Sequence, residues 1–144
     1  MNNPENRIRL EIDARSENVS LARVVAATFI TNLDPTVGEI SDIKTAVSEA
    51  VTNAIIHGYN EGTGIVVISL ASCGREITIE ISDSGVGIEN IENAREPLFT
   101  TKPEMERSGL GFTVMESFMD EVHVVSTPGA GTTITMKKTL LGVQ

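Results

Sequence analysis

The sequence predicts an α+β fold: a two-layer α/β sandwich in which helices cover one face of a mixed, mostly antiparallel sheet. The chain has 144 residues, 40% of them hydrophobic, which suits one domain (residues 1–144) with a single core. The expected elements run strand, helix, helix, two strands, long loop, helix, two strands. Because strands do not alternate with helices, a doubly wound parallel sheet is disfavoured. The two pairs of consecutive strands are typical of antiparallel hairpins.

The first strand and helix are expected near the start of the chain. Residues 7–12 alternate between polar and apolar side chains, which predicts a half-buried strand. Ser16 can cap a helix that runs to about Asn32. We expect this helix to direct four apolar side chains toward the core: Leu21, Val24, Val25 and Phe29.

A second helix is expected after the break at residues 34–36, which contain a proline. It runs to about His57, and Gly58 closes it. Its apolar residues recur at helical spacing: Ile40, Ile43, Val47, Ala50, Val51 and Ala54. This pattern predicts an amphipathic helix that packs on the sheet.

Two hairpins account for most of the remaining chain. Residues 65–71 and 75–83 are separated by a short turn, and the second of these strands alternates strictly. Residues 121–127 and 132–138 flank the turn Pro-Gly-Ala-Gly. A short helix is expected before the second hairpin, at 112–119.

A long polar segment, residues 84–111, connects the two halves and is glycine-rich at both ends. Loops of this length in a compact domain usually have a function.

Charge and cysteine content narrow the classes of function. There are 11 Lys and Arg residues against 20 Asp and Glu, a net charge of −9, which argues against direct binding to nucleic acid or to an anionic membrane surface. A basic protein partner fits better. One cysteine, Cys73, cannot form an internal disulfide, and the sequence shows neither a signal segment nor a long apolar run. We therefore expect a cytoplasmic location.

A helical pair of polar residues is the first candidate for chemistry. Glu49 and Asn53 are four residues apart and share one helix face. The Asn53 oxygen can ligate Mg²⁺, which usually takes few ligands from the protein. Glu49 can accept a proton from an attacking hydroxyl or water. By itself, the pair fits a solvated helix face equally well.

The second candidate follows a predicted strand. Asp83 can accept a hydrogen bond from the exocyclic amine of adenine, and Gly85 and Gly87 allow the backbone to approach a ligand. By itself, this segment also fits an ordinary turn.

The third and fourth candidates lie later in the chain. Gly109 and Gly111 lead into a helix, whose first N–H groups favour phosphate, and Lys102 and Arg107 lie just before them. In the last hairpin, we assign Thr133 to the same site, where a hydroxyl could pair with Asp83 or with a water molecule. The alternatives are a charged surface loop and a threonine that only favours strand structure.

Together and in this order, the four parts resemble the Bergerat-fold (GHKL) ATPase family, which includes DNA gyrase, Hsp90, MutL and the catalytic domains of histidine kinases. Residues 49–53 match its N box, 83–87 its first glycine box and 109–111 its second. The resemblance covers about residues 7–138. It implies that ATP, ADP and Mg²⁺ are cofactors and that residues 88–108 form the ATP lid.

Within that family, residues 49–60, 97–104 and 106–112 are similar to the anti-sigma serine kinases of spore-forming bacteria. The resemblance implies a homodimer that binds and inhibits the sporulation sigma F factor. It also implies phosphorylation of a serine of the anti-anti-sigma factor. Three alternatives remain: a general-stress anti-sigma kinase, a nucleotide-gated sigma-binding module without significant kinase activity, and an ATPase without a partner kinase role.

The resemblance also assigns a role to each matching residue. Glu49 would act as the catalytic base, and Arg107 would lie near the γ-phosphate. Asn53 would bind Mg²⁺, and Arg23 would lie on the partner-binding surface. The residues implied to bind the nucleotide are Asn53, Asp83, Gly85, Gly87, Lys102, Ser108, Gly109, Gly111 and Thr133.

Overall fold

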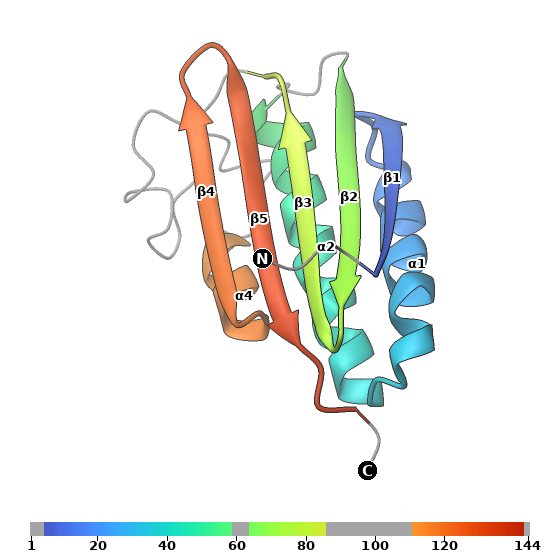
Figure 1. Cartoon of the computed structure of the whole chain (residues 1–144). Helices are drawn as coiled ribbons and strands as arrows, with labels where there is room; N and C mark the ends of the chain where they lie inside the picture. The colour runs from blue at the N-terminus through green and yellow to red at the C-terminus, as the bar shows by residue number, and fades with distance from the viewer. Residues whose placement is uncertain (1–4, 59–63, 86–110, 143–144) are drawn as a thin grey trace.

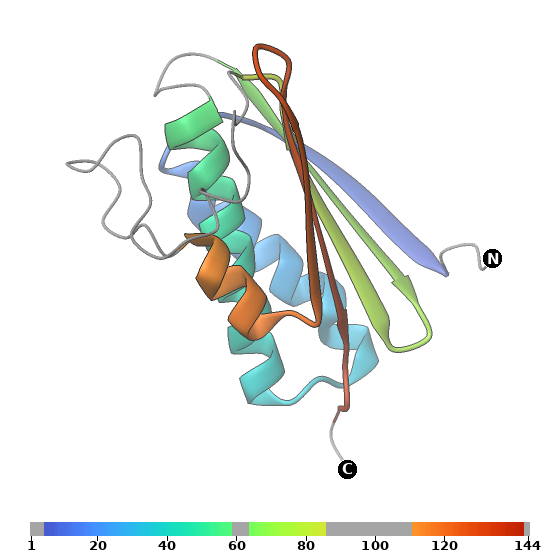
Figure 2. The ribbon, with the colours of Figure 1, turned by 90° about the vertical axis from the view of Figure 1, so that its left-hand side faces the viewer.

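The computed structural model describes residues 5–58, 64–85 and 111–142. In this part of the chain, helices cover one face of a five-stranded sheet (Figure 1). Figure 2 shows the sheet from its edge, with all of the labelled helices of Figure 1 on the same side. The predicted two-layer α+β fold is therefore confirmed. Within the described residues, no helix combines the length and the apolar character that a membrane span requires.

The sheet has the strand order β1-β2-β3-β5-β4. Its strands are β1 (Asn6–Asp13), β2 (Ile65–Cys73), β3 (Glu76–Asp83), β4 (Glu121–Thr127) and β5 (Gly131–Thr139). All four pairings among these strands are antiparallel. The sheet is thus more regular than the mixed, mostly antiparallel arrangement that was expected. The connection from β3 to β4 keeps the chain direction, but β5 lies between these two parallel strands, so no two neighbouring strands are parallel.

Alternation along the strands separates the two faces of the sheet. In β3, Ile77, Ile79 and Ile81 are buried under the helices, whereas Glu76 and Glu80 are exposed on the other face. The same alternation runs through the paired strands, so the face without helices is mainly polar.

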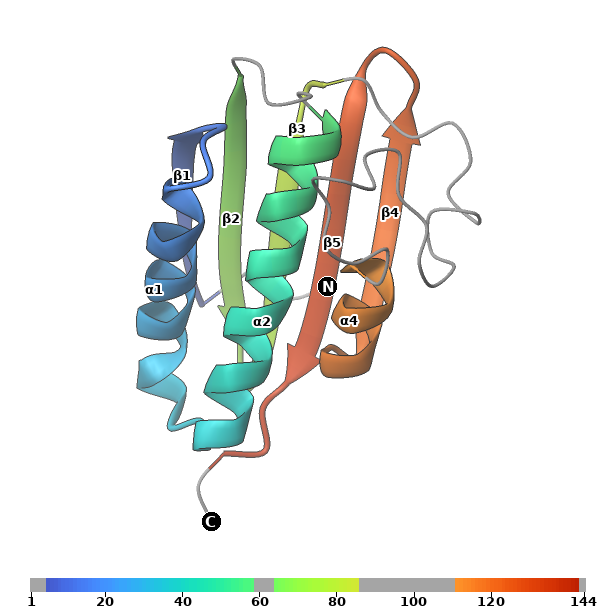
Figure 3. The same cartoon turned by 180° about the vertical axis from the view of Figure 1, so that it is seen from behind.

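Three α-helices cover the sheet in the described part of the chain (Figure 3). They are α1 (Asn18–Ile30), α2 (Val37–Asn53) and α4 (Gly111–Phe118). The central helix α2 packs against α1 on one side and α4 on the other. The core between helices and sheet is built from Ile, Val, Leu, Ala and Met with few aromatic side chains, as the composition predicts.

Helix α1 buries a different face from the one expected. Its buried residues are Ala22, Ala26, Phe29 and Ile30, whereas 48% of Leu21 and 57% of Val24 is exposed. The expectation was therefore wrong for Leu21 and Val24 and right for Phe29; Val25 is partly buried against the core. The small alanines Ala22 and Ala26 allow α1 to approach its neighbours closely, whereas Leu21 and Val24 lie outside that contact.

The start of α1 also differs from the expectation. Ser16 does not cap the helix: the residue before α1 is Glu17, and it makes no side-chain capping hydrogen bond. A 3₁₀ turn, Thr31–Leu33, follows the helix.

Helix α2 begins with a capping box. The Thr36 hydroxyl accepts the Glu39 N–H at 3.0 Å, and the Glu39 carboxylate accepts the Thr36 N–H at 2.9 Å. The predicted apolar stripe is confirmed, with Ile40 partly buried and its other members fully buried. The α-helix ends at Asn53 and continues as a π-helix over Ala54–Gly58, so the expected end is right but the last turn is wider.

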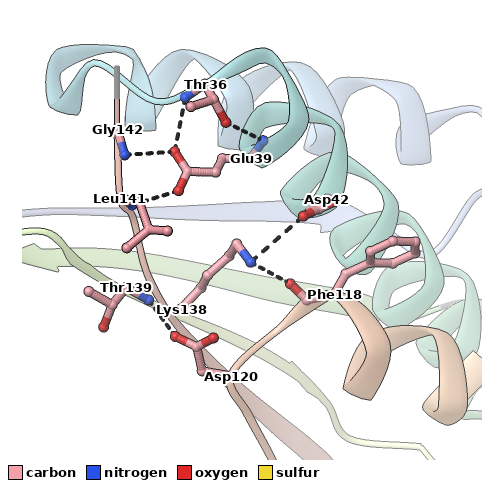
Figure 4. Close-up of polar contacts among 9 residues, drawn as sticks. All are labelled: Thr36, Glu39, Asp42, Phe118, Asp120, Lys138, Thr139, Leu141 and Gly142. Carbon is pink, nitrogen blue, oxygen red and sulfur yellow. Dashed lines mark hydrogen bonds and ion pairs between the residues drawn. The ribbon is translucent and has the colours of Figure 1, made fainter. Parts of the chain in front are cut away.

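The segment after β5 is hydrogen-bonded to the first turn of α2 (Figure 4). The Glu39 carboxylate accepts N–H groups from Leu141 at 2.6 Å and from Gly142 at 3.1 Å. Nearby, Lys138 Nζ donates to the Phe118 carbonyl at 2.9 Å and lies 3.7 Å from the Asp42 carboxylate. The end of β5 therefore connects α2, α4 and the sheet through polar contacts.

Candidate functional site

The C-terminal ends of α2 and β3 lie at the same end of the molecule, together with the turn between β4 and β5 (Figures 1 and 3). Glu49 and Asn53 occupy the last turns of α2 and are both half-buried. The π-helix that follows Asn53 packs against β3 and β5. Tertiary packing thus brings the polar pair of α2 to the strand end that carries Asp83.

Asp83 is the last residue of β3 and is only 8% exposed. It shares the helix-covered face with Ile77, Ile79 and Ile81 because residues two apart in a strand point the same way. The Gly85 N–H donates to Asp83 Oδ1 at 2.9 Å, and the Thr132 N–H also hydrogen-bonds to the carboxyl group.

The environment of Asp83 has opposing effects on its ionisation. Burial raises the pKa of Asp83 above its ordinary value, and the hydrogen bonds from Gly85 and Thr132 only partly oppose this. A carboxylate offers about four acceptor positions. Two backbone donors therefore leave capacity for the amine of a ligand such as adenine.

The structure does not bring Thr133 to Asp83. Its hydroxyl lies 3.1 Å from the Ser82 hydroxyl, and both residues point to the open face of the sheet. The threonine on the Asp83 side is Thr132, which pairs with Asp83 across β3 and β5 and is 3% exposed. The alternation of β5 could have identified it, because Thr132 has the same parity as the buried Ile134.

Several predicted site residues lie outside the described residues: Gly87, Lys102, Arg107, Ser108 and Gly109, with the whole of the expected lid, 88–108. Gly111 is described as the first residue of α4, which packs against α2. The helix that the second glycine box was expected to precede therefore exists and borders the helix with Glu49 and Asn53.

The donor set at the end of α2 suits a magnesium ion held chiefly by a nucleotide. Among the described residues, no group of three or more His, Cys, Asp or Glu side chains could hold a metal by itself. Mg²⁺ commonly keeps water and phosphate oxygens and takes only one or two protein ligands. The half-buried amide of Asn53 can supply one such oxygen.

Arg23 lies on the exposed side of α1, away from the core residues of that helix. It borders a groove of about 350 Å³ between α1 and α2. The groove is lined by two cationic and several hydroxyl side chains together with apolar ones: Arg23, Val37, Ile40, Ser41, Lys44, Thr45 and Ser48. Its chemistry suits an anionic group presented by another molecule.

Comparison with known families and sequences gives consistent results. The model of the family described as "Histidine kinase-like ATPase domain" matches residues 12–138. The anti-sigma F factor of Clostridium acetobutylicum is 60% identical over 134 residues, which cover 93% of this chain and 94% of that protein. The anti-sigma F factor of Geobacillus thermodenitrificans is 58% identical over 134 residues, which cover 92% of each chain.

Solved structures share the fold at much lower identity. The RsbU and RsbW domains of Rv1364c from Mycobacterium tuberculosis superpose with a TM-score of 0.67 at 20% identity, covering 95% of this chain and 33% of that one. The catalytic domain of the histidine kinase ThkA gives a TM-score of 0.56 at 17% identity, covering 92% and 97%. At these identities, the likeness shows the fold alone.

The order of the elements, the convergence of α2 and β3, the family model and the curated relatives all agree. The family match spans most of the chain, and the relatives are covered almost completely. The chain therefore belongs to the histidine kinase-like ATPase domain family and, within it, to the anti-sigma F factors.

Proposed function

We propose that this chain is an anti-sigma factor that binds and inhibits the sporulation sigma F factor and phosphorylates a serine of the anti-anti-sigma factor with Mg²⁺ and ATP. The observation that carries the proposal is the 60% identity over 93% of the chain to a protein named anti-sigma F factor. The kinase part is supported by the match to a histidine kinase-like ATPase domain and by the polar residues at the ends of α2 and β3. The proposal includes a homodimer and a cytoplasmic location.

In the proposed reaction, Glu49 accepts the proton of the partner's seryl hydroxyl. The seryl oxygen forms a bond to the γ-phosphorus of ATP, the bond from that phosphorus to the bridging oxygen breaks, and ADP leaves. Phosphoryl transfer depends mainly on positioning and charge neutralisation, which bound Mg²⁺ would supply. Asn53 would hold the ion, and Arg107 and Lys102 would add positive charge near the phosphates.

Nucleotide binding is proposed to use one group of residues for the adenine base and another for the phosphates. Asp83 would accept a hydrogen bond from the exocyclic amine of adenine, next to the backbone of Gly85 and Gly87. The segment containing Ser108, Gly109 and Gly111 would hold phosphates through its N–H groups at the start of α4.

Arg23 is proposed to contact a protein partner. Its exposure and the neighbouring Lys44 support this, because they form a cationic groove on a chain whose net charge is −9. In the alternative function, nucleotide only sets the conformation that binds sigma F, and no phosphate is transferred.

Replacement of Glu49 tests the catalytic part of the proposal. Glu49→Gln should reduce phosphorylation of the anti-anti-sigma factor by about 10²- to 10⁴-fold, the usual contribution of a general base. Binding of ATP and capture of sigma F should persist. The measurement is transfer of label from γ-labelled ATP to a purified anti-anti-sigma protein, with binding of both ligands measured on the same samples.

Glu80→Gln is the matched control, because Glu80 is exposed on the open face of the sheet. It should transfer phosphate at the wild-type rate. Equal activity of the Glu49 and Glu80 variants would exclude Glu49 as the base. A wild-type chain that captures sigma F in an ATP-dependent manner but labels no serine would favour the nucleotide-gated module.

A further inference from the structure

The turn between β4 and β5 makes an unusually close approach to Asp83. Gly131 has a φ of +114°, and a Cβ placed on it would overlap the Asp83 carbonyl oxygen. The same Cβ would lie 2.7 Å from Ser84 Cα and 2.9 Å from the Asp83 carbonyl carbon. Real Cβ atoms do not approach neighbours so closely, so any other residue at position 131 would displace the end of β3.

Ser126 of the edge strand β4 holds the other side of this turn. Its hydroxyl lies 2.8 Å from the Thr132 hydroxyl and donates to the Gly131 carbonyl at 3.3 Å. Thr132 in turn pairs with Asp83 across the strands, and its N–H hydrogen-bonds to the Asp83 carboxyl group. A continuous set of contacts therefore runs from Ser126 through β5 to the carboxyl group.

We infer that Ser126 and Gly131 are positioning residues that hold the Asp83 carboxylate where it distinguishes adenine from guanine. The inference deepens the proposed nucleotide site and rests on it. Adenine presents an amino donor at its six position, whereas guanine presents an acceptor oxygen there. A carboxylate fixed in place accepts a hydrogen bond from the amino group of adenine and repels the oxygen of guanine. A carboxylate that can turn away no longer distinguishes the two bases.

Two glycines of the same turn allow a matched comparison. Gly129 has a φ of +81° and Gly131 a φ of +114°, so alanine is strained at both positions. A Cβ on Gly129 meets nothing within 4 Å, whereas one on Gly131 meets the Asp83 backbone. The difference between Gly129→Ala and Gly131→Ala therefore isolates the contact with Asp83.

The experiment measures ATP and GTP affinities of the full chain with Mg²⁺ present. Gly131→Ala should weaken ATP binding by about tenfold or more and bring the ATP and GTP affinities closer together, consistent with loss of a hydrogen bond to a charged group. Gly129→Ala should leave both affinities at their wild-type values, although its melting temperature should also fall.

Ser126→Ala tests the same idea without adding atoms, so it applies even if Gly131→Ala does not fold. It should reduce the preference for ATP over GTP by about threefold to tenfold, the range expected for one hydrogen bond. Ser126→Thr, which keeps the hydroxyl, should restore the preference. A purely structural role for Ser126 would lower the melting temperature and leave the nucleotide preference intact.

Asp83→Asn separates the two ways in which the inference can fail. If wild type and Asp83→Asn bind ATP equally, the proposed nucleotide site is wrong and the positioning role with it. If Asp83→Asn loses ATP but folded Ser126→Ala and Gly131→Ala keep the wild-type preference, only the positioning role is wrong. The positioning role is also wrong if Gly129→Ala loses as much ATP affinity as Gly131→Ala.

Discussion

At the scale of single residues, Asp83 illustrates a conflict between stability and binding. Its carboxyl group is buried at the end of β3, and two backbone N–H groups compensate only part of the cost of burying a charge. A buried charged acceptor that serves a ligand therefore lowers the folding stability of the protein, compared with a neutral side chain at the same position.

Asp83→Asn should therefore bind ATP more weakly while folding more stably. ATP affinity should fall by about tenfold or more, since a charge-assisted hydrogen bond is lost. At neutral pH, the free energy of unfolding should rise, because Asn keeps an acceptor for the N–H groups and carries no charge. Isothermal titration and urea unfolding would measure the two effects.

The sign of the pH dependence follows from the raised pKa of Asp83. Burial of the charged Asp83 carboxylate lowers the stability of the wild type by its full amount above the folded-state pKa. Below the unfolded-state pKa the carboxyl group is protonated in both states, and this cost is absent. The stability advantage of Asp83→Asn should therefore shrink as the pH is lowered through that interval. An advantage that persisted at acid pH would assign the effect to something other than the charge.

At the scale of elements, the contacts in Figure 4 show how a helix start and a chain segment far along the sequence stabilise one another. Glu39 both completes the capping box of α2 and accepts two N–H groups of the segment after β5. Burial by itself would raise the pKa of Glu39, but the hydrogen bonds from Thr36, Leu141 and Gly142 outweigh it and lower the pKa.

Glu39→Gln should lower the free energy of unfolding by about 1–3 kcal/mol at pH 7, because hydrogen bonds to a charged acceptor are replaced by weaker ones. Since the folded-state pKa is depressed, this contribution is complete above the unfolded-state pKa and is lost as the pH falls through the folded-state value. Chemical unfolding at several pH values measures it. Glu11→Gln, on the exposed edge strand β1, is the control and should change little; an equal loss in both variants would contradict the special role of Glu39.

At the scale of the whole molecule, the candidate nucleotide site and the proposed partner-binding groove lie at different places on the helical layer. The ends of α2 and β3 carry the candidate nucleotide site, whereas the groove between α1 and α2 carries Arg23 and Lys44. Exposed Leu21 and Val24 lie on the same helix as Arg23 and extend the available surface. Partner binding and nucleotide binding should therefore be separable by mutation.

Arg23→Glu should weaken the proposed binding of sigma F by about tenfold or more, because a cation that would contact an anionic group of the partner is replaced by a charge that repels it. ATP affinity should stay unchanged, because Arg23 lies on the proposed partner-binding surface and not in the nucleotide site. Wild-type binding should also weaken with added salt. Arg9→Glu changes the charge equally on exposed β1 and should bind sigma F normally. If both arginine variants bind alike, the effect is one of net charge and Arg23 has no specific role.

Much of this fold was predictable because its elements have strong local patterns. The alternation of β3 and the apolar stripe of α2 predicted both their structure and their buried faces. Helix α1 was harder, because it has apolar residues on more than one side. Only its packing through Ala22 and Ala26 shows that Leu21 and Val24 face outward.

Residue periodicity and motifs that are local in the chain were enough to predict the fold class, the element order and the family. The types and spacing of Glu49, Asn53 and Asp83 also identified them as candidates. The folded arrangement of the strands was needed to show which threonine faces Asp83 and how Ser126 and Gly131 approach it. Those relations depend on strand register and on close approach between segments distant in the sequence, and neither produces a pattern that is local in the chain.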